Sequence, residues 1–121
     1  MANILLLEDY PSLQRIFSTI LKSDNHKVYA ASNGREGLEL ANQHDIDLVL
    51  VDILMPVMGG IDFLKEYDIK NNHPDVKAIV LTNIFDKDIV EQAKKLGASD
   101  YIIKSDIKPS DIIRIVKDTL S

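Results

Sequence analysis

The chain has 121 residues, which is the size of one domain, and we expect residues 1–121 to form a single domain with its own core. Nineteen acidic and 14 basic side chains give a net charge of −5, which argues against direct nucleic-acid binding. The absence of cysteine excludes disulfides, thiolate metal sites and thiol catalysis. The apolar start "MANILLLED" is too short for a signal peptide or a membrane span, so we expect a cytoplasmic protein with no membrane partner.

Five short apolar runs recur along the chain, and segments with helical periodicity separate them. Runs of this kind are typical of strands that are buried on both faces, as in a parallel sheet. The intervening segments repeat apolar residues at the spacing of an amphipathic helix. The apolar runs are residues 4–7, 28–31, 48–51, 78–81 and 101–103, and the helical segments fall at 13–21, 34–43, 63–67, 89–96 and 112–120.

Local signals mark several helix ends. Asn33 is suited to cap the second helix, Gly97 to follow the fourth, and Pro109 to open the last. Strands that alternate with helices predict βα units with right-handed crossovers. The expected fold is therefore a flavodoxin-like, doubly wound (βα)5 domain, whose five-stranded parallel sheet has the order 2-1-3-4-5.

In such a fold, ligands bind at the carboxyl ends of the strands, near the point where the strand order reverses. Only the second strand ends without a residue of obvious chemical use. In the order 2-1-3-4-5 the first and third strands are neighbours, so their acids should crowd one rim. The strand ends carry Glu8 and Asp9 after the first strand, Asp52 after the third, Thr82 after the fourth and Lys104 after the fifth.

Three carboxylates at one rim repel each other unless a cation lies between them. Oxygen-only ligands, with no histidine or cysteine nearby, favour a hard ion such as Mg²⁺, which commonly shares its coordination sphere with a phosphate. Thr82 and Lys104 are suited to bind the remaining phosphate oxygens. The strand ends therefore predict a phosphoryl site in which one carboxylate is free to act as a nucleophile.

Each of these residues alone also fits an ordinary structural role. The pair Glu8 and Asp9 could interact favourably with the N-terminal end of the following helix dipole, and Asp52 could be a turn residue. Thr82 could be a capping residue and Lys104 a solvated lysine. Their joint placement at four strand ends favours the site.

The predicted site residues lie in four motifs, "LLLEDYPSLQR", "VLVDILMPVMGG", "IVLTN" and "ASDYIIKS". With these motifs the sequence resembles, over essentially its whole length, the receiver domain of two-component response regulators. The resemblance implies that Asp52 accepts a phosphoryl group from a histidine kinase or phosphotransfer protein. It also implies that Thr82 and Lys104 bind the phosphoryl oxygens, and that Tyr101 is a switch aromatic that turns inward with Thr82. The implied Mg²⁺ ligands are Glu8, Asp9, Asp52 and the backbone carbonyl of Leu54.

The resemblance further implies a switch rather than a conventional enzyme, since the domain would catalyse only its own phosphorylation and dephosphorylation. The face formed by the fourth helix, fifth strand and fifth helix would regulate an effector domain or output protein, or form a homodimer. His26, His44 and His73 lie in predicted turns or strand starts, so we expect them at the surface and the phosphoryl donor on another protein.

Three positions depart from the family pattern. Ser105 follows Lys104 where the family commonly has a proline with a cis bond; a cis Lys-Ser bond would cost ~3–4 kcal/mol, so we expect trans. Asn83 stands where a smaller residue is usual, and Leu54 places an apolar side chain at the mouth of the pocket. We expect Leu54 and Asn83 to restrict access of water and to lengthen the lifetime of the phosphorylated state.

Three other functions suit the same fold. A flavin- or nucleotide-binding domain needs a Gly/Ser/Thr-rich loop after the first strand, but the loop here is the acidic "EDYPSLQ". A magnesium-dependent phosphatase with Asp52 as nucleophile usually needs a second acid two residues on, where Leu54 stands. A degenerate receiver that acts only as a protein-binding module would lack key side chains, and all of them are present here.

Overall fold

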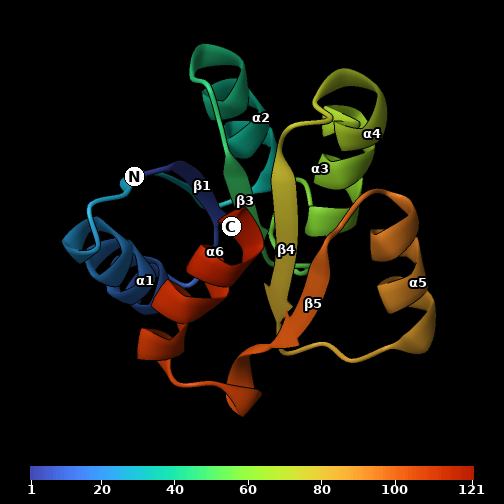
Figure 1. The fold of residues 1–121 in the computed structure, drawn as a ribbon. Coiled ribbons are helices and arrows are strands. Elements are labelled where there is room, and N and C mark those ends of the chain that lie inside the picture. The colour runs from blue at the N-terminus through green and yellow to red at the C-terminus, as the bar shows by residue number, and fades with distance from the viewer.

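The computed structural model describes all residues, 1–121. Five parallel strands form one sheet with the order β2-β1-β3-β4-β5, which confirms the predicted fold class and topology (Figure 1). The strands are β1 (Asn3–Leu7), β2 (Lys27–Ala31), β3 (Leu48–Val51), β4 (Lys77–Thr82) and β5 (Asp100–Ile103).

The chain forms six α-helices where five were expected, because the segment after β3 divides in two. Asp68 adopts a left-handed backbone conformation (φ 52°) that ends one helix and precedes a short second one. Aspartate is among the residues that tolerate this conformation. The fourth and fifth expected helices are therefore labelled α5 and α6. The helices are α1 (Pro11–Ser23), α2 (Gly34–Gln43), α3 (Gly60–Tyr67), α4 (Ile69–Asn72), α5 (Lys87–Lys95) and α6 (Ile112–Leu120), with 3₁₀ turns at Lys104–Asp106 and Pro109–Asp111.

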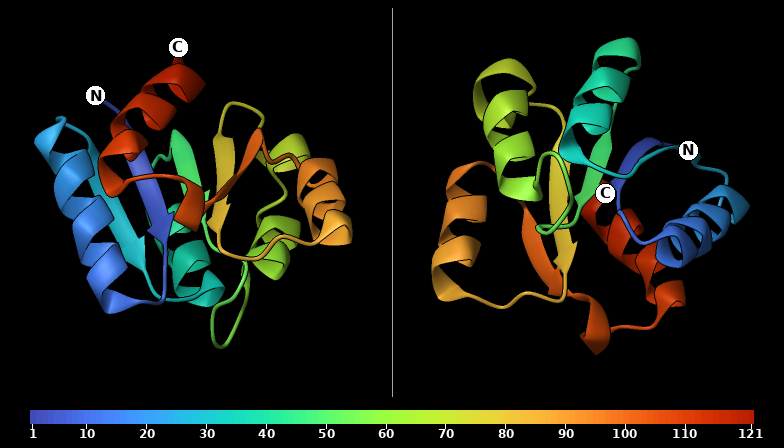
Figure 2. Two further views of the ribbon diagram at one scale, coloured as in Figure 1. Left: turned by 90° about the horizontal axis from the view of Figure 1, so that it is seen from below. Right: turned by 180° about the vertical axis from the view of Figure 1, so that it is seen from behind.

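Helices cover both faces of the sheet. Helices α1 and α6 pack on one face, and α2, α3 and α5 pack on the other (Figures 1 and 2). Alternate residues of each central strand enter opposite cores: in β3, Leu48 and Leu50 face α1 and α6, whereas Val49 and Val51 face the other helices. Burial on both sides explains why these strands appear in the sequence as continuous apolar runs.

The predicted helix-end signals at Asn33 and Gly97 are confirmed, whereas Pro109 precedes α6, which begins at Ile112. Asn33 Oδ1 accepts a hydrogen bond from the N–H of Glu36 at 2.9 Å, as an N-cap should. Gly97 follows the end of α5 with a φ of 108°, a conformation that favours glycine. Pro109 opens the 3₁₀ turn that leads into α6.

All five strands run in the same direction, so their carboxyl ends and the following loops lie at one edge of the sheet. The arrowheads of β4 and β5 point toward this carboxyl edge, at the bottom of Figure 1, and in the left view of Figure 2 the strands point toward the lower side of the molecule, where the loop between β3 and α3 projects. A bilayer span would need a longer and more apolar helix than any that this chain forms.

Candidate functional site

The buried polar residues of the chain all lie at the carboxyl edge. The buried charged or polar residues are Glu8, Asp52 and Thr82, with exposed fractions of 2%, 7% and 1%. Strands β1, β3 and β4 are neighbours in register, since Leu7 pairs with Val51 and Val51 with Val80. The residues that end these strands are therefore brought to one place.

The three acids predicted to share a site do converge. Carboxylate oxygens of Glu8, Asp9 and Asp52 lie within 4.8 Å of one another. Asp9 is exposed, whereas the other two acids are buried. All donors in this cluster are carboxylate oxygens, which is the donor chemistry that Mg²⁺ prefers. The residues present therefore fit a magnesium ion.

Lys104 crosses from the end of β5 to the acids. Its Nζ donates to Glu8 Oε1 at 2.5 Å and to Asp52 Oδ2 at 2.6 Å. Burial lowers the pKa of Lys104, but its hydrogen bonds to Asp52 and Glu8 outweigh that effect and leave the pKa above its ordinary value. Lys104 is therefore charged at neutral pH and offsets part of the repulsion among the carboxylates.

Asp52 keeps one carboxylate oxygen free. Its Oδ2 accepts from Lys104, whereas no donor contacts Oδ1. Ser18 Oγ is the only buried side-chain polar atom that lacks a hydrogen-bond partner. Asp52 Oδ1 also lacks a partner, so it is not a buried atom and reaches solvent. Glu8 differs, because Lys104 holds its Oε1 and the N–H of Tyr10 donates to its Oε2 at 3.0 Å. Of these two buried acids, Asp52 is the one that offers an available oxygen.

Thr82 and Tyr101 meet at the loop that follows β4. Thr82 Oγ1 accepts a hydrogen bond from the N–H of Ile84 at 3.3 Å, and the Tyr101 hydroxyl donates to the carbonyl of Ile84 at 2.6 Å. Burial, followed by the negative charges of Asp52 and Asp86, raises the pKa of Tyr101. The half-buried Tyr101 ring packs against the core, so this tyrosine ties β5 to the loop beside Thr82.

The loop between β3 and α3 holds the backbone of Asp52. A Cβ atom at Gly60 would lie 2.2 Å from the carbonyl oxygen of Asp52, so only glycine fits there. The N–H of Gly60 also donates to the carbonyl of Ile53 at 2.9 Å. These contacts place the start of α3 directly against the end of β3.

The same loop contains a strained residue that the sequence analysis missed. Val57 has a φ of 67°, which a β-branched residue rarely adopts, within a tight turn in which Met58 N–H donates to the carbonyl of Pro56 at 2.7 Å. Its side chain is 79% exposed. The Met-Pro-Val-Met-Gly-Gly segment indicated a turn, but nothing in it indicated which residue would be strained.

The departures from the family pattern occupy defined positions. The peptide bond between Lys104 and Ser105 is trans, as predicted, since the chain contains no cis peptide bond. Asn83 Oδ1 accepts a hydrogen bond from the N–H of Ser105 at 3.0 Å. Leu54 is 66% exposed. The roles of Leu54 in metal binding, and of Leu54 and Asn83 in restricting water, stay predictions.

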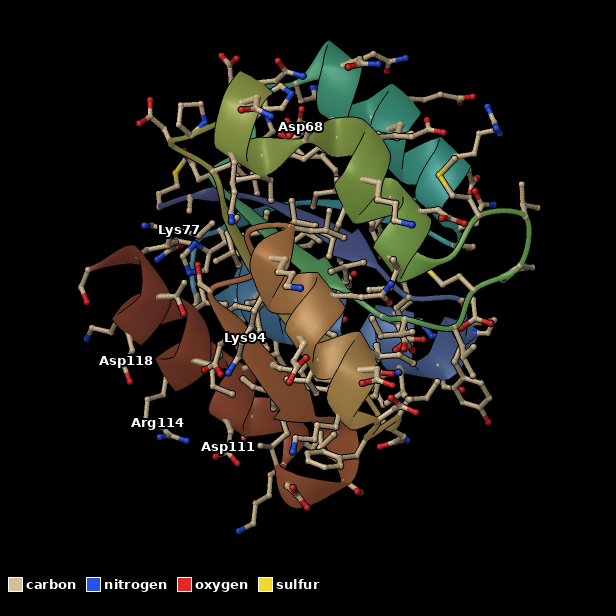
Figure 3. All side chains as sticks on the ribbon, turned by 90° about the vertical axis from the view of Figure 1, so that its right-hand side faces the viewer. Asp68, Lys77, Lys94, Asp111, Arg114 and Asp118 are labelled. Atoms are coloured by element: carbon tan, nitrogen blue, oxygen red, sulfur yellow. The ribbon has the colours of Figure 1, made fainter.

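The face formed by α5, β5 and α6 carries exposed charges of both signs. Figure 3 shows Lys94 on α5 and Arg114 and Asp118 on α6. Strand β5 is an edge strand of the sheet, so its outer side is not paired with another strand. No single sign of charge dominates this face, so its electrostatics do not specify a partner.

Comparisons with known proteins agree on one family. The family model described as the response regulator receiver domain matches residues 4–117. The chemotaxis protein CheY of Halobacterium salinarum is 32% identical over 118 residues, which cover 98% of this chain and 96% of that protein. The transcriptional regulatory protein ZraR of Klebsiella oxytoca is 37% identical over 102 residues, but the matched chain spans only 23% of its length.

Solved structures give the same result. The chemotaxis protein CheY4 of Vibrio cholerae superimposes with a TM-score of 0.89 at 26% identity, covering 99% of both chains. A CheY-like receiver domain protein from Methanospirillum hungatei has a TM-score of 0.90 at 26% identity, covering 99% of this chain and 94% of that one. Together with the acidic pocket at the carboxyl edge, these matches show that the chain belongs to the response regulator receiver domain family.

Proposed function

We propose that the chain is a phosphorylation-dependent signalling switch in which Asp52 accepts a phosphoryl group from a histidine of a partner kinase or phosphotransfer protein. The observation that carries this proposal is the free Oδ1 of Asp52, a solvent-reaching oxygen on an otherwise buried carboxylate. Acids lie beside it, and a charged lysine already contacts its other oxygen.

In the proposed step, Asp52 Oδ1 forms a bond to the phosphorus while the P–N bond of the donor phosphohistidine breaks. The leaving imidazole takes up a proton from solvent. Phosphoryl transfer passes through a loose transition state, so positioning and charge stabilisation account for most of the catalysis. Lys104 would move from the Asp52 carboxylate to a phosphoryl oxygen, and the Thr82 hydroxyl would donate to a second one.

We further propose that Mg²⁺ is required for this step. Glu8, Asp9, Asp52 and the backbone carbonyl of Leu54 would hold the ion, which when bound neutralises charge on the phosphoryl oxygens. The exposed carboxylate of Asp9 accepts no hydrogen bond, whereas both oxygens of Glu8 do. This difference supports a direct contact for Asp9 and a contact partly through water for Glu8.

The output of the switch would be a rearrangement of the α5–β5–α6 face. Thr82 contacts Ile84 N–H, and Tyr101 contacts the carbonyl of the same residue. Drawing the Thr82 hydroxyl to a phosphoryl group would remove the first contact, which biases the loop and Tyr101 toward a second arrangement. This face would then bind an effector domain, an output protein or a second copy of the chain.

The relatives leave the output open. Some are chemotaxis proteins of about the same length, and others, including ZraR and the nitrate/nitrite response regulator NarL of Escherichia coli, are regulators of which the chain spans 23% and 52%. We propose a cytoplasmic role in signal relay, with no chemistry on substrates other than the phosphoryl group of Asp52.

Incubation with Mg²⁺ and acetyl phosphate, followed by intact-mass measurement, tests this proposal. The wild-type chain is expected to gain the mass of one phosphoryl group, and omission of Mg²⁺ is expected to prevent the gain. Asp52→Asn should gain nothing, whereas Asp47→Asn, a matched change at an exposed aspartate that precedes β3, should behave as wild type. A phosphorylated Asp52→Asn chain would contradict the assignment of the acceptor.

A further inference from the structure

Two loops at the carboxyl edge are joined by a side chain that the proposed mechanism does not use. Asn83 Oδ1 accepts a hydrogen bond from the backbone N–H of Ser105 at 3.0 Å. Asn83 directly follows Thr82, and Ser105 directly follows Lys104. The bond therefore connects the neighbours of the two residues proposed to hold the phosphoryl oxygens.

Two of the three departures from the family pattern, Ser105 and Asn83, are the donor and the acceptor of this one bond. A proline after the lysine would have no N–H to donate. A small residue without a side-chain carbonyl, placed after the threonine, would have no oxygen to accept a hydrogen bond from the other loop. In this chain Ser105 supplies the donor and Asn83 the acceptor, so the two unusual residues act as a pair.

The backbone around Ser105 explains why the bond forms. Lys104–Asp106 is a 3₁₀ turn, and its own hydrogen bond runs from the N–H of Ile107 to the carbonyl of Lys104. The first N–H groups of such a turn have no partner within it. Asn83 satisfies the N–H of Ser105, and so caps the turn from another loop.

A second hydrogen bond ties the same two regions from the other side. The Tyr101 hydroxyl donates to the carbonyl of Ile84 at 2.6 Å. Residues 83 and 84 are thus attached to β5 and to the turn that follows it by two independent bonds. These two bonds couple the position of the segment that carries Thr82 to that of the segment that carries Lys104.

We propose that Asn83 is a positioning residue, which fixes the two loops through Ser105 N–H so that Thr82 and Lys104 reach the same phosphoryl group together. This inference rests on the proposed function. Because a loose transition state is stabilised mainly by well-placed donors, relative motion of the loops would weaken both contacts at once. Asn83 would act on the rate of phosphoryl uptake rather than on the binding of Mg²⁺ or of the donor.

The first measurement is phosphoryl uptake from acetyl phosphate by the full chain. Asn83→Ala is expected to lower the uptake rate at saturating donor by about 3- to 10-fold, the rate equivalent of one hydrogen bond. The half-saturating donor concentration and the Kd for Mg²⁺ should stay unchanged. Asn42→Ala is the matched control, since Asn42 is an exposed asparagine of α2 with no side-chain hydrogen bond.

The second measurement reports the bond itself, as amide hydrogen exchange at Ser105 followed by NMR. Asn83→Ala should accelerate this exchange, and Asn83→Asp, which keeps the acceptor oxygen, should restore protection. Hydrolysis of the phosphorylated form is the wrong measurement, because Asn83 is also expected to restrict water there.

Three outcomes would overturn the inference alone: wild-type uptake by Asn83→Ala, unchanged exchange at Ser105, or an equal loss of uptake in Asn42→Ala. The two uptake outcomes require a wild-type chain that becomes phosphorylated, whereas exchange at Ser105 is measured without phosphorylation. A wild-type chain that takes up no phosphoryl group would overturn the proposed function, and this inference with it.

Discussion

Acidic residues are buried and clustered at one edge of the sheet and exposed at the other. At the carboxyl edge, Glu8 and Asp52 are buried close together, with a single lysine between them. At the amino edge, Asp47 is exposed and accepts a hydrogen bond from the N–H of Asn3 at 2.8 Å. There the acid only secures the start of a strand.

The histidines of the amino edge show the same structural role. They were expected at the surface, where they lie, but all three are half-buried rather than fully exposed. His44 stacks on Tyr29 with ring centroids 3.9 Å apart, and His73 stacks on Tyr67 at 4.0 Å. His26 Nδ1 accepts a hydrogen bond from the N–H of Ala2. Each ring has a packing or hydrogen-bond partner, and no cluster of like charge forms.

Repulsion among neighbouring buried acids, rather than charge alone, distinguishes the carboxyl edge from the amino edge. Burying like charges together costs free energy that packing does not recover. A fold keeps such a cluster where a ligand relieves it. The following experiments test this difference between the two edges.

The largest effect is expected from Gly60→Ala. The new Cβ would lie 2.2 Å from the carbonyl oxygen of Asp52, so the end of β3 must shift. We expect a loss of about 1–3 kcal/mol in the free energy of unfolding and, from displacement of the nucleophile, a roughly 10²-fold slower phosphoryl uptake. Urea unfolding and intact-mass kinetics measure these two quantities.

Gly97→Ala is the matched control, because φ 108° strains any side chain there but the new Cβ meets nothing closer than 3.5 Å. It should lose about 1–2 kcal/mol and keep its uptake rate. Equal uptake by the two variants would remove the link between Gly60 and the nucleophile.

The second effect is expected from Lys104→Met. Loss of the cation leaves Glu8 and Asp52 without their shared donor. We expect the free energy of unfolding to fall by about 1–3 kcal/mol at pH 7, a range that already allows for the opening of the site to solvent. Because the pKa of Lys104 is raised in the folded state, its contribution is fully present below pH 10.5, the ordinary pKa of lysine. It is lost as the pH rises through the higher folded value.

Urea unfolding of both chains between pH 7 and pH 11 checks this profile. The two chains differ only at position 104, so the difference between them reports the contribution of Lys104. An advantage of the wild type that disappears between pH 7 and pH 9 would contradict the ion-pair geometry.

The third effect concerns Mg²⁺. At ten times its Kd, a ligand that binds only the folded chain raises the free energy of unfolding by about 1.4 kcal/mol. We expect Asp9→Asn to lose most of this stabilisation at the same Mg²⁺ concentration, and Asp47→Asn at the amino edge to retain it. Thermal unfolding with and without Mg²⁺ measures the shift. Full stabilisation of Asp9→Asn would show that the cluster is not the metal site.

The smallest effect is expected at the amino edge. His44→Ala removes the stacking on Tyr29 and should cost about 0.5–1.5 kcal/mol. Phosphoryl uptake should be unchanged, because the residue lies at the opposite edge of the sheet. A slower uptake in this variant would mean that the two edges are coupled, and the comparison would then fail.

Much of the architecture could be predicted from patterns along the chain. The five apolar runs correspond to the five strands, and segment 34–43 coincides with α2. The predictions failed where local pattern and packing disagree. Ile16 continues the apolar stripe of α1 but is 42% exposed, and Asp68 interrupts a segment that was expected to be one helix.

By itself, the sequence determined the alternation of strands and helices, the acids at the strand ends and the family, because periodicity and motif spacing are local properties of the chain. Only the tertiary structure decided how Lys104 contacts Glu8, 96 residues away, which oxygen of Asp52 stays free, and how Asn83 meets Ser105. These contacts depend on side-chain geometry across neighbouring loops. No periodicity encodes that geometry, because it arises only when the strands are packed side by side.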